Sequence, residues 1–490
     1  MIWTTESIYK ALGAVAPDGA PSFTVDAVRL EPEECAPGSL FVPCTYNLQR
    51  SGRWPNEAAA IMAAARRGAT AAFTNLPRTR FPVAIPIMRL AVAPGSATEP
   101  TVGALVAMGQ YARSTYAGTV VAITGSVGKT TTKDLVHHVL AGQRPAFKTV
   151  DNRNSIAGIC QTLTNLPLDS DFCVIEIGAT EQGHMSHAHV ARPQIAIVTS
   201  IGLSHLENYR SPDDIAREKL SLFDCLDGER IGFLHSSIIE KDEAWHTLAR
   251  SKRASRLITV GFRPHDDIHA ADLRFDGIAS EGTISVFGRP YRFRLPLPGR
   301  HFVGSAMFAA GVACVAGLDM DAAMGALADA TPSAQRSERF RLVIPGGALE
   351  LIDDSYNAAP DSVAALLDSL AERKAGRKIL VLGDMLELGT EAERAHSALR
   401  QKVGGAGVDL LLTVGKNAAL ASGDMAIGAH WHFADAEAAS AAIAGLLRPS
   451  DLVAVKGSHG IGLIKVVTAI RQIGASTPAG PWRIEHETSG

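Results

Sequence analysis

The sequence predicts an α/β protein built from parallel sheets covered by helices. Short apolar segments that alternate with helix-like segments carry this prediction, because strands buried on both faces are continuously apolar. Such segments occur at residues 119–124, 172–179 and 194–202, and again at 349–355, 378–384, 410–415 and 452–458. The irregular stretch TPSAQRSERF separates the two groups, so we expect each group to form its own sheet.

Length and composition divide the chain into several domains. A chain of 490 residues is too long for one hydrophobic core, and 46% hydrophobic residues suit a well-buried globular protein. The segment AVAPGSATEPT, rich in Pro, Gly, Ser and Thr, is typical of a linker. We therefore expect an N-terminal domain at 1–98, a central domain at 99–330, a third domain at 331–474 and a loose tail at 475–490.

Charge and composition give no indication of a nucleic-acid or membrane partner. The net charge is −3 and no long basic run occurs. No apolar run approaches the roughly 18 residues of a membrane span, and the N-terminus MIWTTESIYK lacks the basic start and apolar core of a signal peptide. The six cysteines are scattered without zinc-ligand spacing. We expect a monomer in a reducing cytoplasm that acts on small molecules.

A phosphate-binding loop follows the first strand of the central block. The segment TVVAIT leads into Gly125, Ser126, Val127, Gly128, Lys129, Thr130 and Thr131, and a helix-like segment follows. Backbone N–H groups at a helix start form a cradle for anions, Lys129 can reach the terminal phosphates, and the Thr130 hydroxyl can ligate Mg²⁺. The strict pattern G-x-x-x-x-G-K-[ST] would place glycine where this chain has Ile123, and a simple Gly/Ser turn is the alternative. The strand before and the helix after favour a site for ATP or GTP.

Two further polar side chains follow neighbouring strands of the central block. Glu176 lies in the strand at 172–179, and His205 follows the strand at 194–202. Since the carboxyl ends of parallel strands meet at one edge of a sheet, we expect both side chains beside the phosphate loop. A carboxylate, an imidazole and a hydroxyl there would be reasonable ligands for Mg²⁺. Each residue taken singly also fits a structural role, Glu176 as a helix cap and His205 in a turn.

Lys219 lies on the apolar face of an expected helix. The segment SPDDIAREKLSLFDCL begins with Ser211 and Asp214 in the pattern of a capping box, and Lys219 stands four residues after Ile215 and four before Phe223. Burial lowers the pKa of a lysine, and a neutral amine can take up CO₂ to form a carbamate that ligates a metal. The alternative is a lysine whose stem covers apolar surface while its ammonium reaches water. Spacing alone favours this second interpretation.

Together these segments resemble the Mur ligase family. The motifs TGSVGKTTTKDL, DNRNSIAG, EIGATEQG, TSIGLSHLENYRSPDDIAREK, DDSYNAAPDS, VLGDMLELG and VKGSHGIGL occur in the family's order over roughly residues 100–470. The resemblance implies an N-terminal domain that holds a UDP-linked substrate, a central P-loop ATPase domain with a parallel sheet, and a C-terminal Rossmann-like ligase domain. The missing first glycine also fits, because the family's loop keeps only the later glycines.

The resemblance also implies an ATP-dependent reaction that joins a carboxylate to an amine. The γ-phosphate of ATP passes to the carboxylate, and the amine then displaces phosphate from the acyl phosphate, leaving an amide, ADP and phosphate. The match is greatest to the branch of the family that adds D-alanyl-D-alanine to UDP-N-acetylmuramoyl-tripeptide in peptidoglycan synthesis. One alternative is a family member that joins another carboxylate and amine in secondary metabolism or polymer synthesis. A P-loop NTPase switch is a second, but it would need neither Lys219 nor DDSYNA.

Family motifs assign further residues to the site. The resemblance implies catalytic roles for Lys129, Glu176, His205 and Lys219, and a magnesium site of Thr130, Glu176, His205 and carbamylated Lys219. It implies that ATP is bound by residues 125–131, His301, Arg339 and Asp354, and the substrates by Asn152, Asn154, Ser155, Tyr356, Asn357, Lys456 and Ser458. Arg339 is included because it precedes Asp353 by fourteen residues, as the family's inter-domain arginine does.

The sequence departs from the family pattern in segments that recognise substrates. Phe302 and Ser305 replace two asparagines of the segment H-N-v-x-N, and Ser155, Ala359 and His459 replace two asparagines and an arginine elsewhere. The first block reads NLQRSGRWPNEAAA where the motif D-G-H is usual. The phosphoryl-transfer residues are intact. We therefore expect the family's chemistry with an altered substrate pocket.

Overall fold

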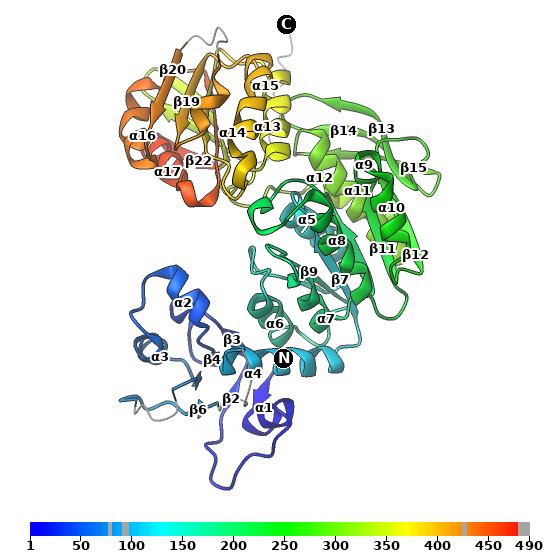
Figure 1. Ribbon diagram of the computed structural model, residues 1–490, viewed down its shortest axis with the longest axis vertical. Helices are drawn as coiled ribbons and strands as arrows, with labels where there is room; N and C mark the ends of the chain where they lie inside the picture. The colour runs from blue at the N-terminus through cyan, green and yellow to red at the C-terminus, as the bar shows by residue number, and fades with distance from the viewer. Residues whose placement is uncertain (77–80, 91–97, 424–428, 479–490) are drawn as a thin grey trace, which may run out of the picture.

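The computed structural model describes residues 1–76, 81–90, 98–423 and 429–478. Figure 1 shows three groups of elements in chain order, coloured blue, cyan to green, and yellow to red. Both outer groups contact the central one. The expected linker AVAPGSATEPT falls largely on residues 91–97, outside the described part of the chain. Within the described ranges, no helix is both long and apolar enough to cross a bilayer.

The N-terminal group is a small sheet that shares its core with the central group. Its four-stranded parallel sheet contains β3 (Ala27–Arg29), β4 (Ser39–Phe41), β5 (Ala71–Thr74) and β6 (Ile87–Arg89). The other elements are β1 (Trp3–Thr4), α1 (Thr5–Ala11), β2 (Thr24–Val25), α2 (Thr45–Ser51) and α3 (Glu57–Arg66). Trp3 is fully buried, and its Nε1 donates to the Thr164 carbonyl at 2.9 Å. One buried cluster therefore runs from this sheet into α4 (Pro100–Thr115) and α6 (Ile156–Thr164).

A nine-stranded sheet in the order β15-β14-β13-β12-β11-β10-β7-β9-β8 forms the central group. Its strands are β7 (Thr119–Thr124), β8 (Ala146–Lys148), β9 (Phe172–Glu176), β10 (Ile195–Val198), β11 (Ile231–His235), β12 (Arg256–Gly261), β13 (Ile268–Phe275), β14 (Ser280–Val286) and β15 (Arg289–Leu295). The three predicted strands are all present and parallel. The sequence analysis missed β8 and β11 to β15. Of these, β14 and β15 are antiparallel and, being half exposed, do not read as continuous apolar runs.

Side chains along β7 alternate between two cores. Val120 and Ala122 face the cluster formed with α4, α6, α7 (Ala188–Ala191) and α8 (Pro212–Leu220). Val121 and Ile123 face α5 (Lys129–Ala141), α11 (Arg300–Val315) and α12 (Met320–Ala328). Two short helices, α9 (Ser236–Lys241) and α10 (Glu243–Arg250), lie toward β12. Because β9 and β10 flank β7 on opposite sides, the carboxyl end of β7 is where open α/β sheets bind ligands.

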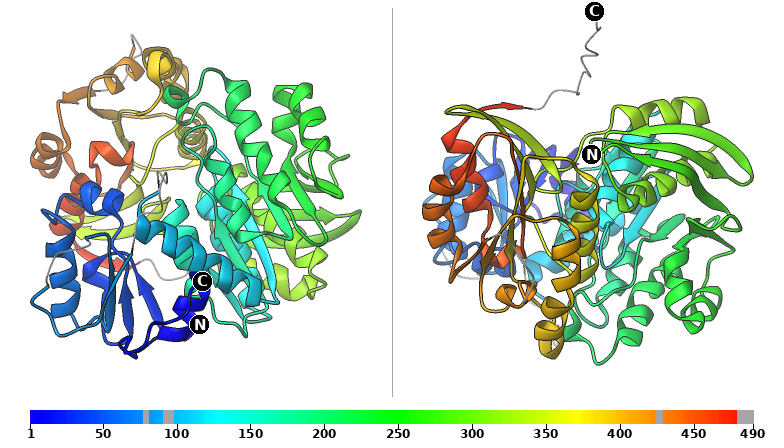
Figure 2. Two further views of the ribbon diagram at one scale, coloured as in Figure 1. Left: turned by 60° about the horizontal axis from the view of Figure 1, so that its bottom comes forward. Right: turned by 90° about the horizontal axis from the view of Figure 1, so that it is seen from above.

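The C-terminal group is a seven-stranded sheet in the order β20-β19-β18-β21-β17-β16-β22. Its strands are β16 (Glu338–Ile344), β17 (Gly347–Asp354), β18 (Arg377–Gly383), β19 (Leu410–Val414), β20 (Ala429–Phe433), β21 (Asp451–Lys456) and β22 (Ala475–Pro478). α13 (Pro360–Glu372), α14 (Ala392–Ala398) and α15 (Arg400–Gly405) cover one face, and α16 (Ala436–Ile443) and α17 (Ile464–Ile473) cover the other (Figure 2). The four predicted strands are parallel, as in a Rossmann-like sheet, and β20, which the sequence analysis missed, extends the parallel part beside β19.

The tail does not begin where the sequence predicted. Residues 475–478 form β22, which pairs antiparallel with β16, so the expectation of a loose tail from residue 475 is wrong for these four residues. The segment is too short and too polar to predict a strand from its sequence alone, and the neighbouring edge of β16 supplies its hydrogen-bond partners. Residues 479–490 lie outside the described part of the chain.

Two arginines of the C-terminal group hold a hairpin of the central group. Arg373 donates to the Gly277 carbonyl at 2.9 Å, and Arg339 donates to the Ile278 carbonyl at 3.3 Å. Arg373 also forms an ion pair with Glu350. Gly277 has a φ of +79°, and a Cβ there would lie 3.0 Å from Arg373 Cγ, so glycine permits this close approach.

Replacing Arg373 should destabilise the chain by leaving Glu350 as an unpaired charge. Arg373 and Glu350 are only 9% and 19% exposed, and breaking a buried pair costs about 3 kcal/mol or more in the free energy of unfolding. We expect Arg373→Ala to lower the urea midpoint clearly, and Arg373→Met combined with Glu350→Leu to recover most of the loss. Arg292→Ala, an exposed arginine on β15 opposite Thr283, is the matched control. Equal midpoints for Arg373→Ala and Arg292→Ala would contradict this role.

Candidate active site

The loop after β7 is shaped by the end of β10. Gly128 has a φ of +83°, and a Cβ on Gly125 would lie 2.0 Å from Thr199 Oγ1. The same hydroxyl donates to the Val127 carbonyl at 2.6 Å. Glycine at both positions therefore lets the loop close against Thr199 and leads directly into α5 at Lys129. This is the strand, loop and helix that the sequence predicted for a phosphate cradle.

Lys129 is half-buried and folds back over the loop. Its Nζ donates to the carbonyls of Gly125 at 2.7 Å and Ser126 at 3.3 Å. Burial lowers the pKa of Lys129, the Glu176 carboxylate opposes this effect, and the Arg336 guanidinium adds to it. The ammonium thus lies inside the loop, where phosphate oxygens can replace the carbonyls as its partners.

Glu176 connects the loop to the segment that follows β8. It is 1% exposed, its Oε2 accepts from Thr130 Oγ1 at 2.8 Å, and its Oε1 accepts from Asn154 Nδ2 at 2.7 Å. Three predicted site residues therefore lie together. Among the described residues, no group of three His, Cys, Asp or Glu side chains could hold a metal by itself. A hydroxyl and one carboxylate do fit Mg²⁺, which takes few protein ligands and completes its shell with water and phosphate oxygens.

Lys219 lies on α8, and its side chain is buried. The residue is only 1% exposed, which contradicts the alternative of an ammonium that reaches water. Burial and the nearby Lys129 ammonium lower the pKa of Lys219 to about 7, and Glu218 opposes the shift. The side chain is therefore close to half neutral at neutral pH.

The start of α8 matches the predicted capping box only in part. Ser211 is the N-cap, and its hydroxyl accepts from the Asp214 amide at 3.3 Å. The Asp214 carboxylate accepts from Arg217 at 3.0 Å instead of reaching back to the Ser211 amide. The reason is the short side chain of aspartate at a position where a capping box has Glu or Gln.

His205 lies at the boundary with the C-terminal group. It has a φ of +60° in the turn after β10, and its Nδ1 pairs with the Glu387 carboxylate. The Glu207 amide also donates to the Glu387 carbonyl at 3.4 Å. The expected grouping of His205 with Glu176 is therefore not the arrangement observed. The strand order correctly predicted the edge of the sheet at which His205 lies. The left-handed backbone conformation of His205 sets the direction of its side chain.

Asp354 and Lys456 bring the third domain to His301. They are register partners at the ends of β17 and β21, and Lys456 Nζ donates to Asp354 Oδ2 at 2.7 Å and to the Asn357 carbonyl at 3.0 Å. Desolvation lowers the pKa of His301 to about 4, Asp354 opposes this effect, and Lys456 adds to it. Three predicted site residues from two domains thus meet at one place, with His301 neutral at neutral pH.

Arg339 does not lie at the phosphate loop. It belongs to β16, opposite Ile352, and donates to the Ile278 carbonyl at the hairpin contact. Burial, with Arg373 beside it, lowers the pKa of Arg339 to about 10. The prediction that Arg339 completes the ATP site therefore does not match its position. Counting residues back from Asp353 ignores that the strand has already begun at Glu338.

Arg336 is the arginine near the loop, and the sequence analysis missed it. Its Cζ lies 4.1 Å from the centre of the Tyr356 ring, and its charge contributes to the lowered pKa of Lys129. Gln335 and Ser337, on either side, have positive φ values of 58° and 59°. Such strained positions flank functional groups more often than chance. The irregular stretch TPSAQRSERF, which leads into β16, was the one feature of the sequence that could have indicated a functional residue here.

Some predicted substrate residues mainly hold the backbone. Ser155 caps α6, and the Asn152 carbonyl accepts from the Asn154 amide at 2.7 Å. Ser458 Oγ accepts from the Leu386 amide at 2.9 Å and donates to the Ala358 carbonyl at 3.3 Å.

The departures from the family pattern are mostly accommodated inside the fold. Phe302 is 5% exposed in the core of α11, and Ser305 accepts from Thr132 Oγ1 at 3.0 Å. Ala359 is the buried N-cap of α13. His459 is exposed, with its ring 5.7 Å from that of Tyr356. Ser155, the fifth replacement, is exposed as the N-cap of α6, so His459 is the one of the five that faces solvent beside the third-domain site residues.

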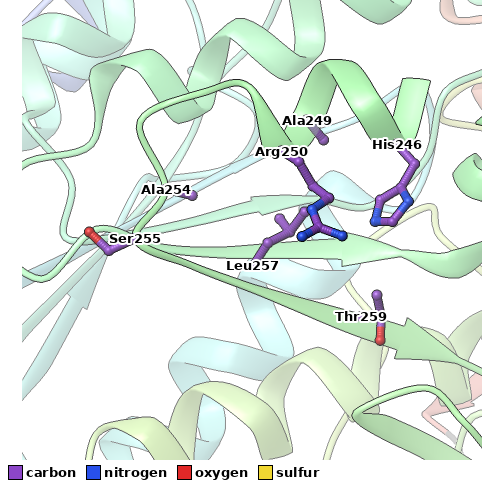
Figure 3. A pocket seen from close by; sticks show the side chains of 7 residues that line it. All are labelled: His246, Ala249, Arg250, Ala254, Ser255, Leu257 and Thr259. Carbon is purple, nitrogen blue, oxygen red and sulfur yellow. The ribbon is translucent and has the colours of Figure 1, made fainter. Parts of the chain in front are cut away.

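Two cavities lie apart from the loop. One of about 410 Å³ lies between α10 and β12, where His246 and Arg250 project toward Leu257 (Figure 3). β12 is separated from β7 by two strands, so this cavity is not part of the loop site. The other, of about 320 Å³, lies between the N-terminal group and β8, and Arg29, Lys148 and Arg153 are among its lining residues.

Fold and site define a class: a P-loop nucleotide-binding α/β protein whose phosphate loop faces a second, Rossmann-like domain. Comparison with family models is consistent with this class. The Mur ligase middle domain matches residues 123–313, and the Mur ligase glutamate ligase domain matches residues 336–459.

Relatives and solved structures show the same relationship. The UDP-N-acetylmuramoyl-tripeptide–D-alanyl-D-alanine ligase of Escherichia coli K12 is 30% identical over 92% of this chain and 95% of its own. The enzyme of that name in Bacillus subtilis 168 is 30% identical over 71% of this chain and 75% of its own. The fold is similar to that of MurF from Acinetobacter baumannii (TM-score 0.77, 22% identity, 96% and 99% coverage) and of MurF from Thermotoga maritima in complex with ADP (TM-score 0.72, 20% identity, 92% and 98% coverage). The chain belongs to the Mur ligase family and is a ligase.

Removing the loop ammonium should abolish ADP formation without unfolding the protein. In Lys129→Ala the phosphates lose their charged donor, and removing such a donor costs roughly 10²- to 10³-fold in rate. Lys129 is half-buried at the start of a helix, so its truncation opens no core cavity. Lys465→Ala, an exposed lysine on α17 that pairs with Glu437, serves as the control. ADP release at a rate near that of the unaltered enzyme would show that the loop does not hold the nucleotide.

Proposed function

We propose that this ligase uses ATP to activate a carboxylate as an acyl phosphate and then joins it to an amine. UDP-N-acetylmuramoyl-tripeptide and D-alanyl-D-alanine are the proposed pair, as the names of the relatives suggest. The observation that carries the proposal is that Lys129 and Thr130 of the loop lie with Glu176 of β9, and that Arg336 of the third domain is near Lys129. A nucleotide held on one domain is thereby presented to substrates held by another.

The transfer requires positive charge more than a side-chain nucleophile. The γ-phosphoryl group moves from ATP to a carboxylate oxygen of the substrate, and ADP leaves. Lys129 and Arg336 are the cations near the loop, and they would stabilise charge on the phosphoryl oxygens. The amine nitrogen then attacks the acyl carbon, the phosphate leaves, and the amine loses a proton.

The metal and the lysine belong to the same group of side chains. Mg²⁺ held by Thr130 and Glu176 would neutralise phosphate charge. We propose that the Lys219 amine reacts with CO₂ to give a carbamate and a proton, and that this anion completes the group. Burial supports this proposal because it favours the neutral amine that reacts with CO₂, and the nearby Lys129 ammonium supports it because it favours an anion over a second ammonium.

The nucleoside of ATP and the UDP-linked end of the carboxylate substrate would lie on opposite sides of the group formed by Thr130, Glu176 and Lys219. Neutral His301, with Asp354 beside it, is proposed to contact the nucleoside of ATP. Arg29, Lys148 and Arg153 around the cavity between the N-terminal group and β8 would suit the anionic, UDP-linked end of the carboxylate substrate.

We propose a reducing cytoplasm as the compartment of this protein. Its six cysteines are free thiols, which supports this proposal.

A ligase with a different amine is the second candidate, because His459 replaces an arginine of the family pattern. Its exposed ring lies beside Tyr356, where a change from guanidinium to imidazole would weaken the binding of a carboxylate on the amine substrate. Ala359 also replaces an asparagine in this domain, whereas Tyr356, Asn357, Lys456 and Ser458 match the family motifs.

A reconstituted reaction tests the substrate pair. With ATP, Mg²⁺, UDP-N-acetylmuramoyl-tripeptide and D-alanyl-D-alanine, we expect a UDP-linked pentapeptide, measured by mass spectrometry, together with stoichiometric ADP. Omitting either substrate should suppress ADP formation, because the acyl phosphate needs the carboxylate to form and the amine to be discharged. ADP release with another acid–amine pair, and no pentapeptide, would favour the second candidate.

The pH and CO₂ dependence of activity tests the carbamate. The pKa of Lys219 is lowered to about 7, so the neutral amine is lost as the pH falls through that value and carbamate formation falls with it. Activity should therefore decrease below about pH 7 and respond most strongly to added bicarbonate there. Lys219→Ala should lose roughly 10- to 100-fold and be partly rescued by acetate. Normal activity of Lys219→Ala in CO₂-free buffer would exclude the carbamate.

A further inference from the structure

Glu218 is a buried carboxylate beside Lys219 that no step of the proposed reaction uses. It is 8% exposed, and both of its oxygens accept from backbone amides: Oε2 from Gly183 at 2.9 Å and Oε1 from Met185 at 2.6 Å. These amides belong to the first turn of a 3₁₀ helix at His184–His187. One side chain of α8 thus holds a segment that follows β9.

The held segment begins at Glu176. Its near end is anchored where the Gly178 amide donates to the Asn154 carbonyl at 2.9 Å, next to the bond between Asn154 and Glu176. A Cβ on Gly178 would lie 2.5 Å from Asn154 Oδ1, so little side-chain volume fits there. Glu218 holds the far end. The segment therefore has one anchor at the Glu176 group and one on the helix that carries Lys219.

We propose that Glu218 is a positioning residue that sets the spacing between the Glu176 carboxylate and the Lys219 side chain. Consecutive residues on α8 share these tasks: Glu218 binds the segment after β9, and Lys219 enters the phosphate region. The inference rests on the proposed function, in which both Glu176 and Lys219 serve the phosphoryl transfer. Holding such groups within a fraction of an ångström is what supporting hydrogen bonds contribute in metal and phosphate sites.

Because Glu218 is charged, variants can distinguish its proposed positioning role from a purely structural role in the fold. Its carboxylate favours the ammonium of Lys219 and would repel a carbamate at the same position. Glu218→Gln keeps the shape but removes the charge and one acceptor, so carbamate formation should be unchanged or increased while positioning is lost. Glu218→Asp keeps the charge but is one methylene too short to reach both amides. His187, Tyr209 and Cys225 are the other titratable groups within electrostatic reach of Glu218, and they are unchanged in both variants.

The experiment compares the variants in three measurements on the full chain. We expect kcat for ADP release to fall roughly 10- to 100-fold in both, with the KM for ATP unchanged, since the loop is untouched. Hydrogen exchange should increase in peptides spanning 180–187 but not in those of α5. The ¹³C signal of the carbamate in ¹³C-bicarbonate should be retained in both and be at least as intense in Glu218→Gln as in the unaltered enzyme.

Asp451→Asn is the matched control. Asp451 is 3% exposed and accepts from the Arg448 amide at 2.7 Å and from Arg377, at the start of β21, the opposite end from Lys456. It should change stability without changing kcat or the carbamate signal. Turnover of both Glu218 variants within twofold of the unaltered enzyme would overturn the proposal. Loss of both the carbamate signal and turnover, together with increased hydrogen exchange throughout α8, would also overturn it. A carbamate signal absent from the unaltered enzyme would instead contradict the carbamate, while kcat and exchange still test Glu218.

Discussion

An excess of buried positive charge organises the active site. Lys129 is half-buried near Glu176, a carboxylate that is itself 1% exposed, and Lys219 is buried near Lys129. Lys133 of α5 is also buried, and it pairs with Asp134. Burial lowers the pKa of all three lysines, and Glu176 opposes that effect for Lys129 and Lys133. An ammonium without a full partner costs several kcal/mol in the folded chain, and a bound anion removes that cost. Phosphate oxygens are such an anion, so the penalty of burying Lys129 and Lys219 favours the nucleotide complex.

The surrounding fold keeps this charge cluster and its ligands in one place. Parallel strands β7, β9 and β10 end at the same edge, which brings Lys129, Glu176 and Thr199 together. The third domain closes the site from the other side through Arg336 and the pair of Asp354 with Lys456. The hairpin contact of Arg373 with Gly277 lies on this same boundary. Central and third domains therefore meet where the chemistry is proposed, and a change in their docking would change the site.

Sequence patterns predicted the parts of the site that depend on local structure. The apolar strands, the glycine loop, Lys129, Thr130 and Glu176 follow from strand, turn and helix rules acting over a few residues. Directions set by long-range contacts were not predictable in this way. His205 is turned toward Glu387 by a left-handed residue, and Arg336 rather than Arg339 reaches the loop because of where β16 begins. Burial of Lys219 could be read only from the packed helix.

The departures from the family pattern gain a physical interpretation from their positions. Phe302 packs in the core behind α11, and Ser305 bonds to Thr132 of the phosphate-loop helix, so both stabilise the central domain. Ala359 lacks the capping side chain of an asparagine, and there the Ser362 hydroxyl accepts from the Ala359 amide at 3.0 Å. His459, by contrast, is exposed beside Tyr356, whose ring also contacts Arg336. Ser155 is exposed as well, but it caps α6 in the central domain. His459 is therefore the replacement placed beside the third-domain groups, which separates the proposed phosphoryl-transfer residues from the proposed selectivity for the amine.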